Sequence, residues 1–238
     1  MNTVKQTELY TDRLNELRKK IHKYQAQPIE VEYICKWLER KRKENTGKVQ
    51  FVPIPALKDW MYSEKEGIVR HKKGTSHFFT VRGIITNNIV DTEVSTWNQP
   101  ILDQKEGGYL VILCQERDNN IKFLLHAKFE PGNIGYVQLG PTIQATSSNL
   151  KQHHEGRKPR FSEYINHAKT TIIYSAKHNE EGSRFWRKSN VNRLVLLPRN
   201  ENLKEDDNYI WLSLDQIKAL MLYNNVVNPF VKTILSPL

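Results

Sequence analysis

The sequence predicts an α+β fold, in which a mixed, largely antiparallel sheet occupies the middle of the chain and helices lie at both ends. Three observations predict it. Apolar residues recur at helical spacing near the N-terminus, short β-rich runs fill the middle, and a helix-capping pattern stands near the C-terminus. The 238 residues suffice for one compact domain with an appendage.

The first 48 residues predict two amphipathic helices separated near Pro28. Apolar residues spaced three to five positions apart indicate the first helix, and Ile34, Trp37 and Leu38 indicate the second. This stretch holds twelve Lys or Arg and seven Asp or Glu, which is +5 of the net charge of +10. Because basic residues usually form the solvated face of such helices, nucleic acid is not an expected partner. We therefore divide the chain into a basic helical segment, 1–48, and a folded module, 49–238.

From residue 49 the pattern changes to short runs rich in β-branched and aromatic residues, separated by turn signals such as Asp118-Asn119-Asn120. Near the end, Ser213 and Gln216 form a capping box, which predicts a helix that packs back on the sheet. The expected strands are 78–85, 109–115, 121–129, 136–139, 170–174 and 194–197.

Several classes of protein are not expected. The longest apolar stretch, Tyr109–Cys114, has six residues, whereas a membrane-spanning helix needs about 20. The first twenty residues are polar and charged, so we expect a cytoplasmic protein without membrane contact. Cys35 and Cys114 have no metal-ligand spacing, and P-loop, GxGxxG, GxSxG and HExxH motifs are missing. We expect no metal and no cofactor.

The run 121–130 carries the strongest sign of chemistry. In a strand, Phe123, Leu125 and Phe129 would face the core, and His126, Lys128 and Glu130 would follow one another on the opposite face, about 7 Å apart. A base, a cation and a second titratable group on one face suit proton transfer. An ordinary solvated strand face would show the same pattern. The sequence also leaves open whether Glu130 or His126 is the base.

Other segments offer binding groups. Side chains with neutral donors and acceptors alternate with apolar ones along 142–146 and suit sugar hydroxyls. A hydrogen-bonded edge strand would show the same pattern. Arg184 beside Phe185 suits a phosphate next to a base, although a surface turn with ion pairs is equally ordinary. The candidate substrate-binding residues are Trp97, Gln99, Thr142, Gln144, Thr146, Asn149, Tyr174, Ser183, Arg184 and Phe185.

Motifs along residues 50–238 stand in a specific order. The most specific are Glu-Pro-Gly at 130–132, Pro-Thr-Ile-Gln-Ala-Thr at 141–146 and Glu-Gly-Ser-Arg-Phe at 181–185. This order resembles the NDP-hexose 2,3-dehydratase family of deoxysugar biosynthesis. The further matching pieces are Trp60, Ile68-Val-Arg-His71, His77–Ile84, Glu93–Leu102, Phe123–Lys128, Leu139-Gly140, Asn149, Trp211–Leu214 and Val227-Asn228.

The resemblance implies a Nudix-like module that has lost metal-dependent pyrophosphatase chemistry. It implies a hydro-lyase acting on an NDP-4-keto-6-deoxyhexose, with dTDP as the expected carrier. Removal of the C3 proton and loss of the C2 hydroxyl give a 3,4-diketo-2,6-dideoxy sugar, without a redox cofactor. Lys128 would hold the C4 enolate, and His126, titrating near neutrality, would protonate the departing hydroxyl.

Two further expectations follow from the resemblance. Many members carry two tandem modules, whereas this chain is long enough for one, so we expect a homodimer. The alternative function is a non-catalytic module that binds a sugar nucleotide or RNA.

Overall fold

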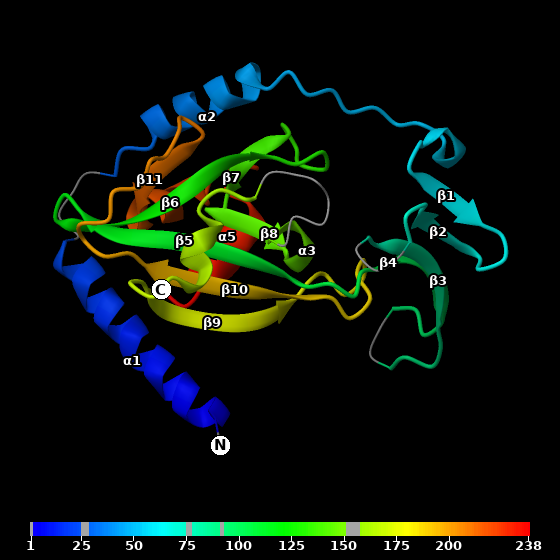
Figure 1. Ribbon diagram of the computed structural model, residues 1–238, viewed down its shortest axis with the longest axis horizontal. Helices are drawn as coiled ribbons and strands as arrows, with labels where there is room; N and C mark the ends of the chain where they lie inside the picture. The colour runs from blue at the N-terminus through cyan, green and yellow to red at the C-terminus, as the bar shows by residue number, and fades with distance from the viewer. Residues whose placement is uncertain (1, 25–28, 75–77, 91–92, 151–157) are drawn as a thin grey trace.

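A computed structural model describes residues 2–24, 29–74, 78–90, 93–150 and 158–238. Across these residues the α+β prediction is confirmed: helices cover a seven-stranded sheet, and a smaller four-stranded sheet stands beside it (Figure 1). Among the described helices, none is both long and apolar enough to cross a membrane.

The seven-stranded sheet is mixed. Its main path has the order β11-β6-β5-β10-β9, while β7 pairs with β6 and β8 pairs with β5. β10 runs parallel to β5, and the other pairings given for this sheet are antiparallel. The strands are β5 (Gly108–Arg117), β6 (Asn120–Phe129), β7 (Val137–Gly140), β8 (Ile143–Thr146), β9 (Thr171–Asn179), β10 (Ser189–Leu196) and β11 (Tyr209–Ser213).

Both faces of this sheet are covered, so the chain has two apolar cores. Phe123 and Leu125 on β6 face the first core, which the helices close, whereas Leu124 faces the second core with Phe161 and Ile165. The helices over the first core are α1 (Asn2–Lys23), α2 (Glu32–Glu44), α4 (Leu214–Leu220) and α5 (Pro229–Leu235). The short helices α3 (Ser147–Leu150) and η2 (Ser162–Asn166) complete the body.

Local signals explain several element ends. Asp118 and Asn119 both have positive φ, as the tight turn of the β5–β6 hairpin requires. Ser213 and Gln216 form the predicted capping box at the start of α4. The two N-terminal helices are present as predicted, whereas Pro28 lies outside the described residues. The domain division at residue 48 remains a prediction.

The four-stranded sheet lies in a projecting part of the chain, residues 49–103, which we call the arm (Figure 1). Its end pairs with the body, because Leu102 N donates to Arg184 O at 2.9 Å and Trp186 N donates to Leu102 O at 2.8 Å. The arm contains η1 (Ile54–Ala56), β1 (Trp60–Ser63), β2 (Ile68–His71), β3 (Thr80–Thr86) and β4 (Trp97–Asp103), paired in chain order.

Two expectations about strands differ from the structure. The expected strands do not include residues 97–103, but these residues form the edge strand β4, where a proline without an N–H is tolerated. Phe129 was expected in the core, but it is 37% exposed and packs on Tyr136 with a ring separation of 5.8 Å. Phe129 is the last residue of β6 and is not among the side chains that pack against the first core.

Candidate functional site

A hollow of about 200 Å³ lies where β5 and β10 begin and β8 ends. We call it the polar hollow. It brings together four residues selected from the sequence, which are Lys128, Gln144, Thr146 and Asn149. Its other lining residues are Gly108, Tyr109, Leu110, Ala145, Glu180, Lys188, Asn190 and Phe230.

Close backbone packing shapes this end of the sheet. A Cβ on Gly107 would lie 2.6 Å from Ser189 O, and a Cβ on Gly108 would lie 2.7 Å from Ala145 O. Both glycines therefore let β5 enter between β8 and β10, where no side chain fits. Asn190 secures the entry, because its Oδ1 accepts a hydrogen bond from Gly108 N at 2.9 Å.

The Glu130 carboxylate is held by three neutral amides from separate parts of the chain. It accepts hydrogen bonds from Gln144 Nε2 at 2.9 Å, Asn228 Nδ2 at 3.1 Å and Asn133 Nδ2 at 3.2 Å. Gln144 comes from β8, and Asn228 is also the N-cap of α5. These bonds fix both carboxylate oxygens without placing a cation directly on them.

Gln144 links this carboxylate to the polar hollow. Its Nε2 is used by Glu130, while its Oε1 is buried and has no hydrogen-bond partner among the described residues. Because a buried acceptor without a partner is costly, this oxygen is a place where a ligand hydroxyl would be stabilised. Thr146 shapes the rim, since its hydroxyl accepts from Asn149 N at 3.2 Å.

Two lysines line the polar hollow, and burial lowers the pKa of both. For Lys128, the nearby Glu130 carboxylate opposes this shift. For Lys188, the Glu180 and Glu106 carboxylates oppose it. Lysines with lowered pKa values give up a proton more readily than exposed ones, so both suit general acid chemistry as well as binding of an oxyanion.

Different contacts position the two lysine side chains. Lys188 Nζ donates to Gln104 Oε1 at 2.5 Å and lies 5.0 Å from the centre of the Phe185 ring. Lys128 passes Gly140, where a Cβ would lie 3.3 Å from the lysine Cβ. Glycine at 140 therefore leaves the space that the Lys128 stem occupies.

His126 faces a different hollow, of about 410 Å³, under α2. Its ring stacks on Tyr209 at 4.4 Å with an angle of 9° between the planes. Burial, helped by the positive charge of Lys128, lowers the pKa of His126 to about 4. The expectation that it titrates near neutrality is therefore wrong, and it is neutral at pH 7. Lys128 lines this second hollow too, together with Lys41, Glu44, Asn45, Ala127, Phe129, Val137 and Asn208.

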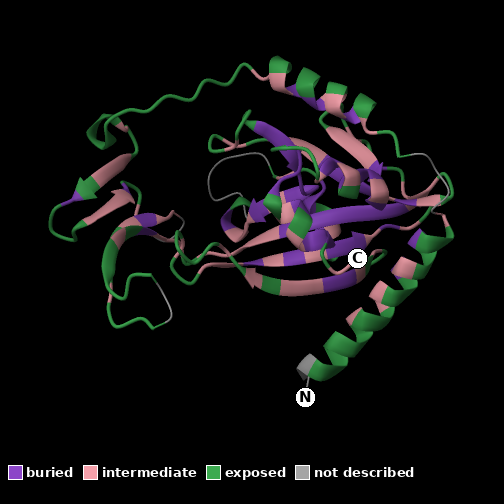
Figure 2. Cartoon of the chain, turned by 180° about the vertical axis from the view of Figure 1, so that it is seen from behind, coloured by how far each residue is buried: buried purple, intermediate pink, exposed green. Residues whose placement is uncertain are grey.

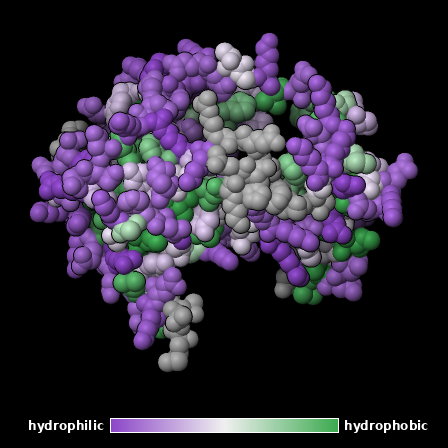
Figure 3. Space-filling view, viewed as in Figure 1, coloured by the Kyte–Doolittle hydropathy of each residue, from purple (hydrophilic) through white to green (hydrophobic). Residues whose placement is uncertain are grey.

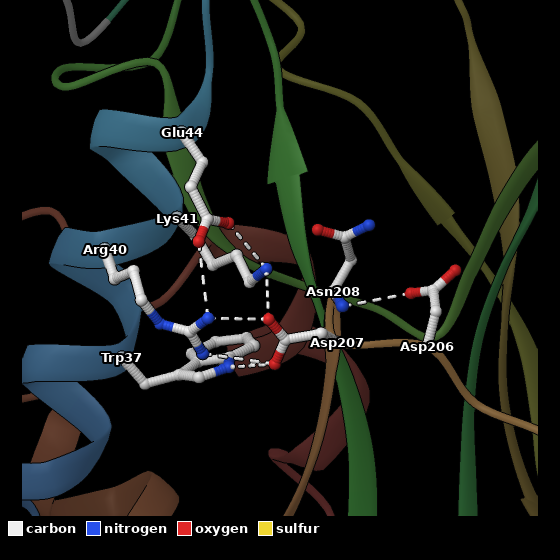
Figure 4. Close-up of polar contacts among 7 residues, drawn as sticks. All are labelled: Trp37, Arg40, Lys41, Glu44, Asp206, Asp207 and Asn208. Atoms are coloured by element: carbon white, nitrogen blue, oxygen red, sulfur yellow. Dashed lines mark hydrogen bonds and ion pairs between the residues drawn. The ribbon is translucent and has the colours of Figure 1, made fainter.

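A charge cluster fastens α2 over the second hollow (Figure 4). Asp207 accepts hydrogen bonds from Arg40 Nη1 and Lys41 Nζ, both at 2.7 Å, and from Trp37 Nε1 at 3.4 Å. These donors hold the pKa of the Asp207 carboxyl far below its usual range. Glu44 binds the same Lys41 ammonium at 2.7 Å, so this buried cation is paired on two sides.

Another group of predicted residues gathers where the arm meets the body. Trp97 Nε1 donates to Gln99 Oε1 at 2.9 Å, and Gln99 Nε2 donates to Ser183 O at 2.6 Å. Arg184 follows with an exposed side chain, and Phe185 lies under the Lys188 ammonium. The loop 180–188 thus connects this group with the polar hollow.

Two predicted binding residues lie in the core, and the structure does not bring them to the hollow. The Thr142 hydroxyl accepts from Leu113 N at 3.0 Å and donates to Leu124 O, so it joins β5 and β6. Tyr174 donates to Ile234 O at 2.5 Å, and burial raises the pKa of its phenol.

Sequence reasoning did not select Lys188 and Asn190. The available signal for Lys188 was its place three residues after the Glu-Gly-Ser-Arg-Phe block, whereas Asn190 lies on a polar stretch that reads as a loop. Asn228 was matched as part of a motif but was given no role. Among the residues with a described position, no group of three or more His, Cys, Asp or Glu is placed to hold a metal ion.

Three curated relatives share one name, dTDP-4-dehydro-6-deoxy-alpha-D-glucopyranose 2,3-dehydratase. The relative from Saccharopolyspora spinosa is 35% identical over 206 residues, which cover 86% of this chain and 41% of the relative. Those from Amycolatopsis orientalis and Streptomyces violaceoruber are 34% and 31% identical, covering 87% and 85% of this chain and 44% and 45% of their own. The chain thus spans less than half the length of these relatives.

A solved structure is similar only at a low level. It is the complex between the C-terminal domain of mouse MUTYH and human PCNA, of which one chain matches with a TM-score of 0.37 and 10% identity, covering 56% of this chain and 86% of that one. A likeness at this level carries no argument. The family model for NDP-hexose 2,3-dehydratase, in contrast, matches residues 31–238. With this match and the identity to the three relatives, the chain belongs to the NDP-hexose 2,3-dehydratase family.

Proposed function

We propose that this chain is a hydro-lyase that removes water from an NDP-linked 4-keto-6-deoxyhexose, with dTDP as the carrier, in deoxysugar biosynthesis. Family membership and the names of the relatives support this substrate. The observation that carries the chemistry is a carboxylate, Glu130, fixed by three neutral amides next to a hollow that is lined by two half-buried lysines.

The proposed reaction is a stepwise elimination. The C4 ketone acidifies the C3 proton, which the Glu130 carboxylate removes, and the electron pair moves to the C4 oxygen. Lys128 donates a hydrogen bond to that enolate oxygen. When the C4 carbonyl re-forms, the C2 hydroxyl leaves as water and a C2–C3 double bond appears. The resulting enol takes a proton at C2 and becomes the 3,4-diketo-2,6-dideoxy sugar.

The acid for the departing hydroxyl is assigned here to Lys188 instead of His126. His126, with a pKa of about 4, is a neutral imidazole at pH 7 and is therefore a poor acid. Its ring also faces the other hollow. Lys188 lines the polar hollow together with Lys128, and burial lowers its pKa. Lys188 therefore carries a proton and releases it more readily than an exposed lysine would.

The nucleotide is expected outside the polar hollow. A volume of about 200 Å³ lies below the 300–1,000 Å³ that is usual for a site enclosing a whole ligand. The hollow therefore suits the hexose alone. We propose that Arg184, on the loop that leads away from Lys188, binds the diphosphate, and that Trp97 packs against the base or the sugar.

Replacing Arg184 by alanine should weaken binding of dTDP roughly tenfold or more, because a lost charge-assisted contact costs on the order of 1.5–3 kcal/mol. Replacing Trp97 by alanine should also weaken binding, because the packing of its ring on the ligand is lost. Calorimetric titration of dTDP into each variant measures the change. Arg187→Gln, in the same loop, is the matched control and should bind as the wild type does. Unchanged affinity in both alanine variants would place the nucleotide elsewhere.

Replacing Lys188 by methionine should slow loss of water by roughly a hundredfold or more, while C3 exchange remains measurable. The reason is that exchange needs only the base, whereas loss of the hydroxyl needs the acid. Lys177→Met, an exposed lysine on β9, serves as the control. If C3 exchange is lost together with dehydration, Lys188 acts in the first step and the assignment fails.

The function itself is tested by incubating the chain with dTDP-4-keto-6-deoxyglucose in heavy water, followed by mass spectrometry. The expected product has lost one water and carries solvent deuterium. A chain that binds this substrate but neither exchanges the C3 proton nor releases water is a binding module, and the proposal is then wrong.

We also propose that the chain acts as a homodimer. The curated relatives are more than twice as long as the stretch that matches this chain. A second copy would supply a comparable mass, and a two-fold dimer would contain two equivalent hollows.

A further inference from the structure

Buried polar atoms without a hydrogen-bond partner are few in this chain. Much of the surface drawn in Figure 3 is hydrophilic, and polar atoms there bond to water. The strands of the main sheet, in contrast, are largely buried (Figure 2). Among the described residues, three side-chain atoms are buried without a partner, namely Gln144 Oε1, Ser162 Oγ and Asn192 Oδ1. Of these three residues Gln144 lines the polar hollow, so a ligand in that hollow is in place to supply the missing donor.

The contact with Glu130 fixes which end of the Gln144 amide is the oxygen. Gln144 Nε2 donates to Glu130 Oε1 at 2.9 Å. If the amide were turned over, its oxygen would face the carboxylate oxygen, and two acceptors would lie together without a proton between them. The end of the Gln144 amide that has no partner is therefore an acceptor.

The same contact identifies the oxygen of Glu130 that is free to take a proton. A carboxylate oxygen offers about two acceptor positions. On Oε2 both are used, by Asn133 Nδ2 at 3.2 Å and by Asn228 Nδ2 at 3.1 Å. On Oε1, Gln144 is the one donor among the described residues. The lone pair that remains for the C3 proton therefore lies on Oε1, next to the Gln144 amide.

The groups around the reacting carbon of the proposed substrate differ in what they offer to an acceptor. C3 carries the proton that Glu130 removes, and the C3 hydroxyl is attached to the same carbon. The C4 ketone oxygen has no proton to donate, so an amide oxygen does not bind it. The C2 hydroxyl leaves as water and needs an acid, which is the role given to Lys188. The C3 hydroxyl is therefore the group that suits an acceptor beside Glu130 Oε1.

We infer that Gln144 is a specificity-determining residue, whose Oε1 accepts a hydrogen bond from the C3 hydroxyl and thereby directs the C3 proton toward Glu130 Oε1. This inference rests on the proposed function. The hydroxyl stays on C3 in the enol that follows loss of water, so the contact persists through the elimination. The site then favours 4-keto sugars with a free C3 hydroxyl, and it discriminates against those in which this hydroxyl is missing, substituted or inverted.

Calorimetric titration with ligands that do not react tests this contact. The probes are dTDP-6-deoxyglucose, which has a C4 hydroxyl in place of the ketone, and its 3-deoxy and 2-deoxy analogues. The wild type should bind the 3-deoxy ligand roughly tenfold more weakly than the parent, because a buried acceptor stays without a partner. Gln144→Met should bind these two with equal affinity, while the effect of removing the C2 hydroxyl stays as in the wild type. Gln50→Met, the same replacement at an exposed position outside the hollow, should keep the wild-type difference.

A measurement on the wild type alone does not depend on how the variant folds. The 3-deoxy-3-fluoro analogue carries an atom at C3 that accepts weakly and cannot donate. Gln144 Oε1 would repel this fluorine, so the fluoro ligand should bind more weakly than the 3-deoxy ligand. A lysine at the same position would attract the fluorine and reverse the order of the two ligands, and that result would overturn the inference.

The remaining outcomes separate the contact from the proposed function. Equal affinity of the wild type for the parent and the 3-deoxy ligand would refute the contact, and so would a difference that survives in Gln144→Met. Either result leaves dehydration intact, because the heavy-water assay with the 4-keto substrate measures it separately. A wild type that binds none of these ligands would refute the proposed substrate and the contact together.

Discussion

Glu130→Gln should slow exchange of the substrate C3 proton with solvent deuterium by a factor of roughly 10²–10⁴, the range that a positioned general base contributes. Glutamine keeps the shape of the side chain but has no basic oxygen of comparable strength. Incubation with the 4-keto substrate in heavy water, followed by mass spectrometry over time, measures the exchange rate directly. Dehydration should fall by the same factor, because it depends on the same proton.

Glu130 also holds a turn, so stability has to be measured beside activity. The amide introduced at this position would face the amide donors of Asn133 and Asn228, which now donate to the carboxylate at 3.2 and 3.1 Å. Thermal unfolding of the variant separates this structural effect from loss of the base. Glu181→Gln changes a carboxylate that binds Ser183 Oγ in the exposed loop, and it should exchange normally. Exchange at the wild-type rate in Glu130→Gln would refute the assignment of Glu130 as the base.

The free energy of unfolding should fall by about 2–3 kcal/mol as the pH drops from about 6.5 to about 4, because of His126. Its pKa in the folded chain is about 4, below the usual value, since burial and Lys128 disfavour the imidazolium. Between these pH values the unfolded chain binds a proton that the folded chain does not. The stabilisation is therefore complete above about pH 6.5 and is lost as the pH falls.

Urea unfolding at pH 7 and pH 4.5 measures this effect. In His126→Asn the drop between the two pH values should shrink, even though loss of the ring stacked on Tyr209 lowers stability at both. Only the difference between the two pH values is compared, so the lost stacking cancels. His22→Asn, on the exposed side of α1, is the control and should keep the wild-type drop. An equal drop in wild type and His126→Asn would contradict the assignment.

Most of the main sheet was predictable because its signals are local. The β5–β6 hairpin follows from apolar runs around a turn, and the start of α4 follows from two residues three positions apart. The arm strand β4 was not predictable in the same way. It contains Pro100, and most of its side chains contact solvent, so it lacks both the alternation and the apolar run by which strands are recognised.

The relative positions of site residues within a single strand could be predicted from the sequence. The contacts between residues of different strands could not. The placement of Lys128 on β6, and of Glu130 directly after the end of that strand, required only the period of a strand. Lys188 reaches the same hollow from the start of β10, which depends on a pairing between distant segments. The pKa of His126 depends on what buries it, and no pattern in its own strand contains that information.

The parallel pairing of β5 with β10 also bears on how the protein folds. Tyr109 lies opposite Val191, so 191 − 109 = 82 positions separate the two partners. Hairpins such as β5–β6 close short loops, whereas this pairing must overcome the entropy of closing a long one, which makes it slow. Because Tyr109 and Asn190 come from these two strands, the polar hollow takes shape only when they meet. During refolding, the ability to bind a sugar nucleotide should therefore return after the secondary structure has re-formed.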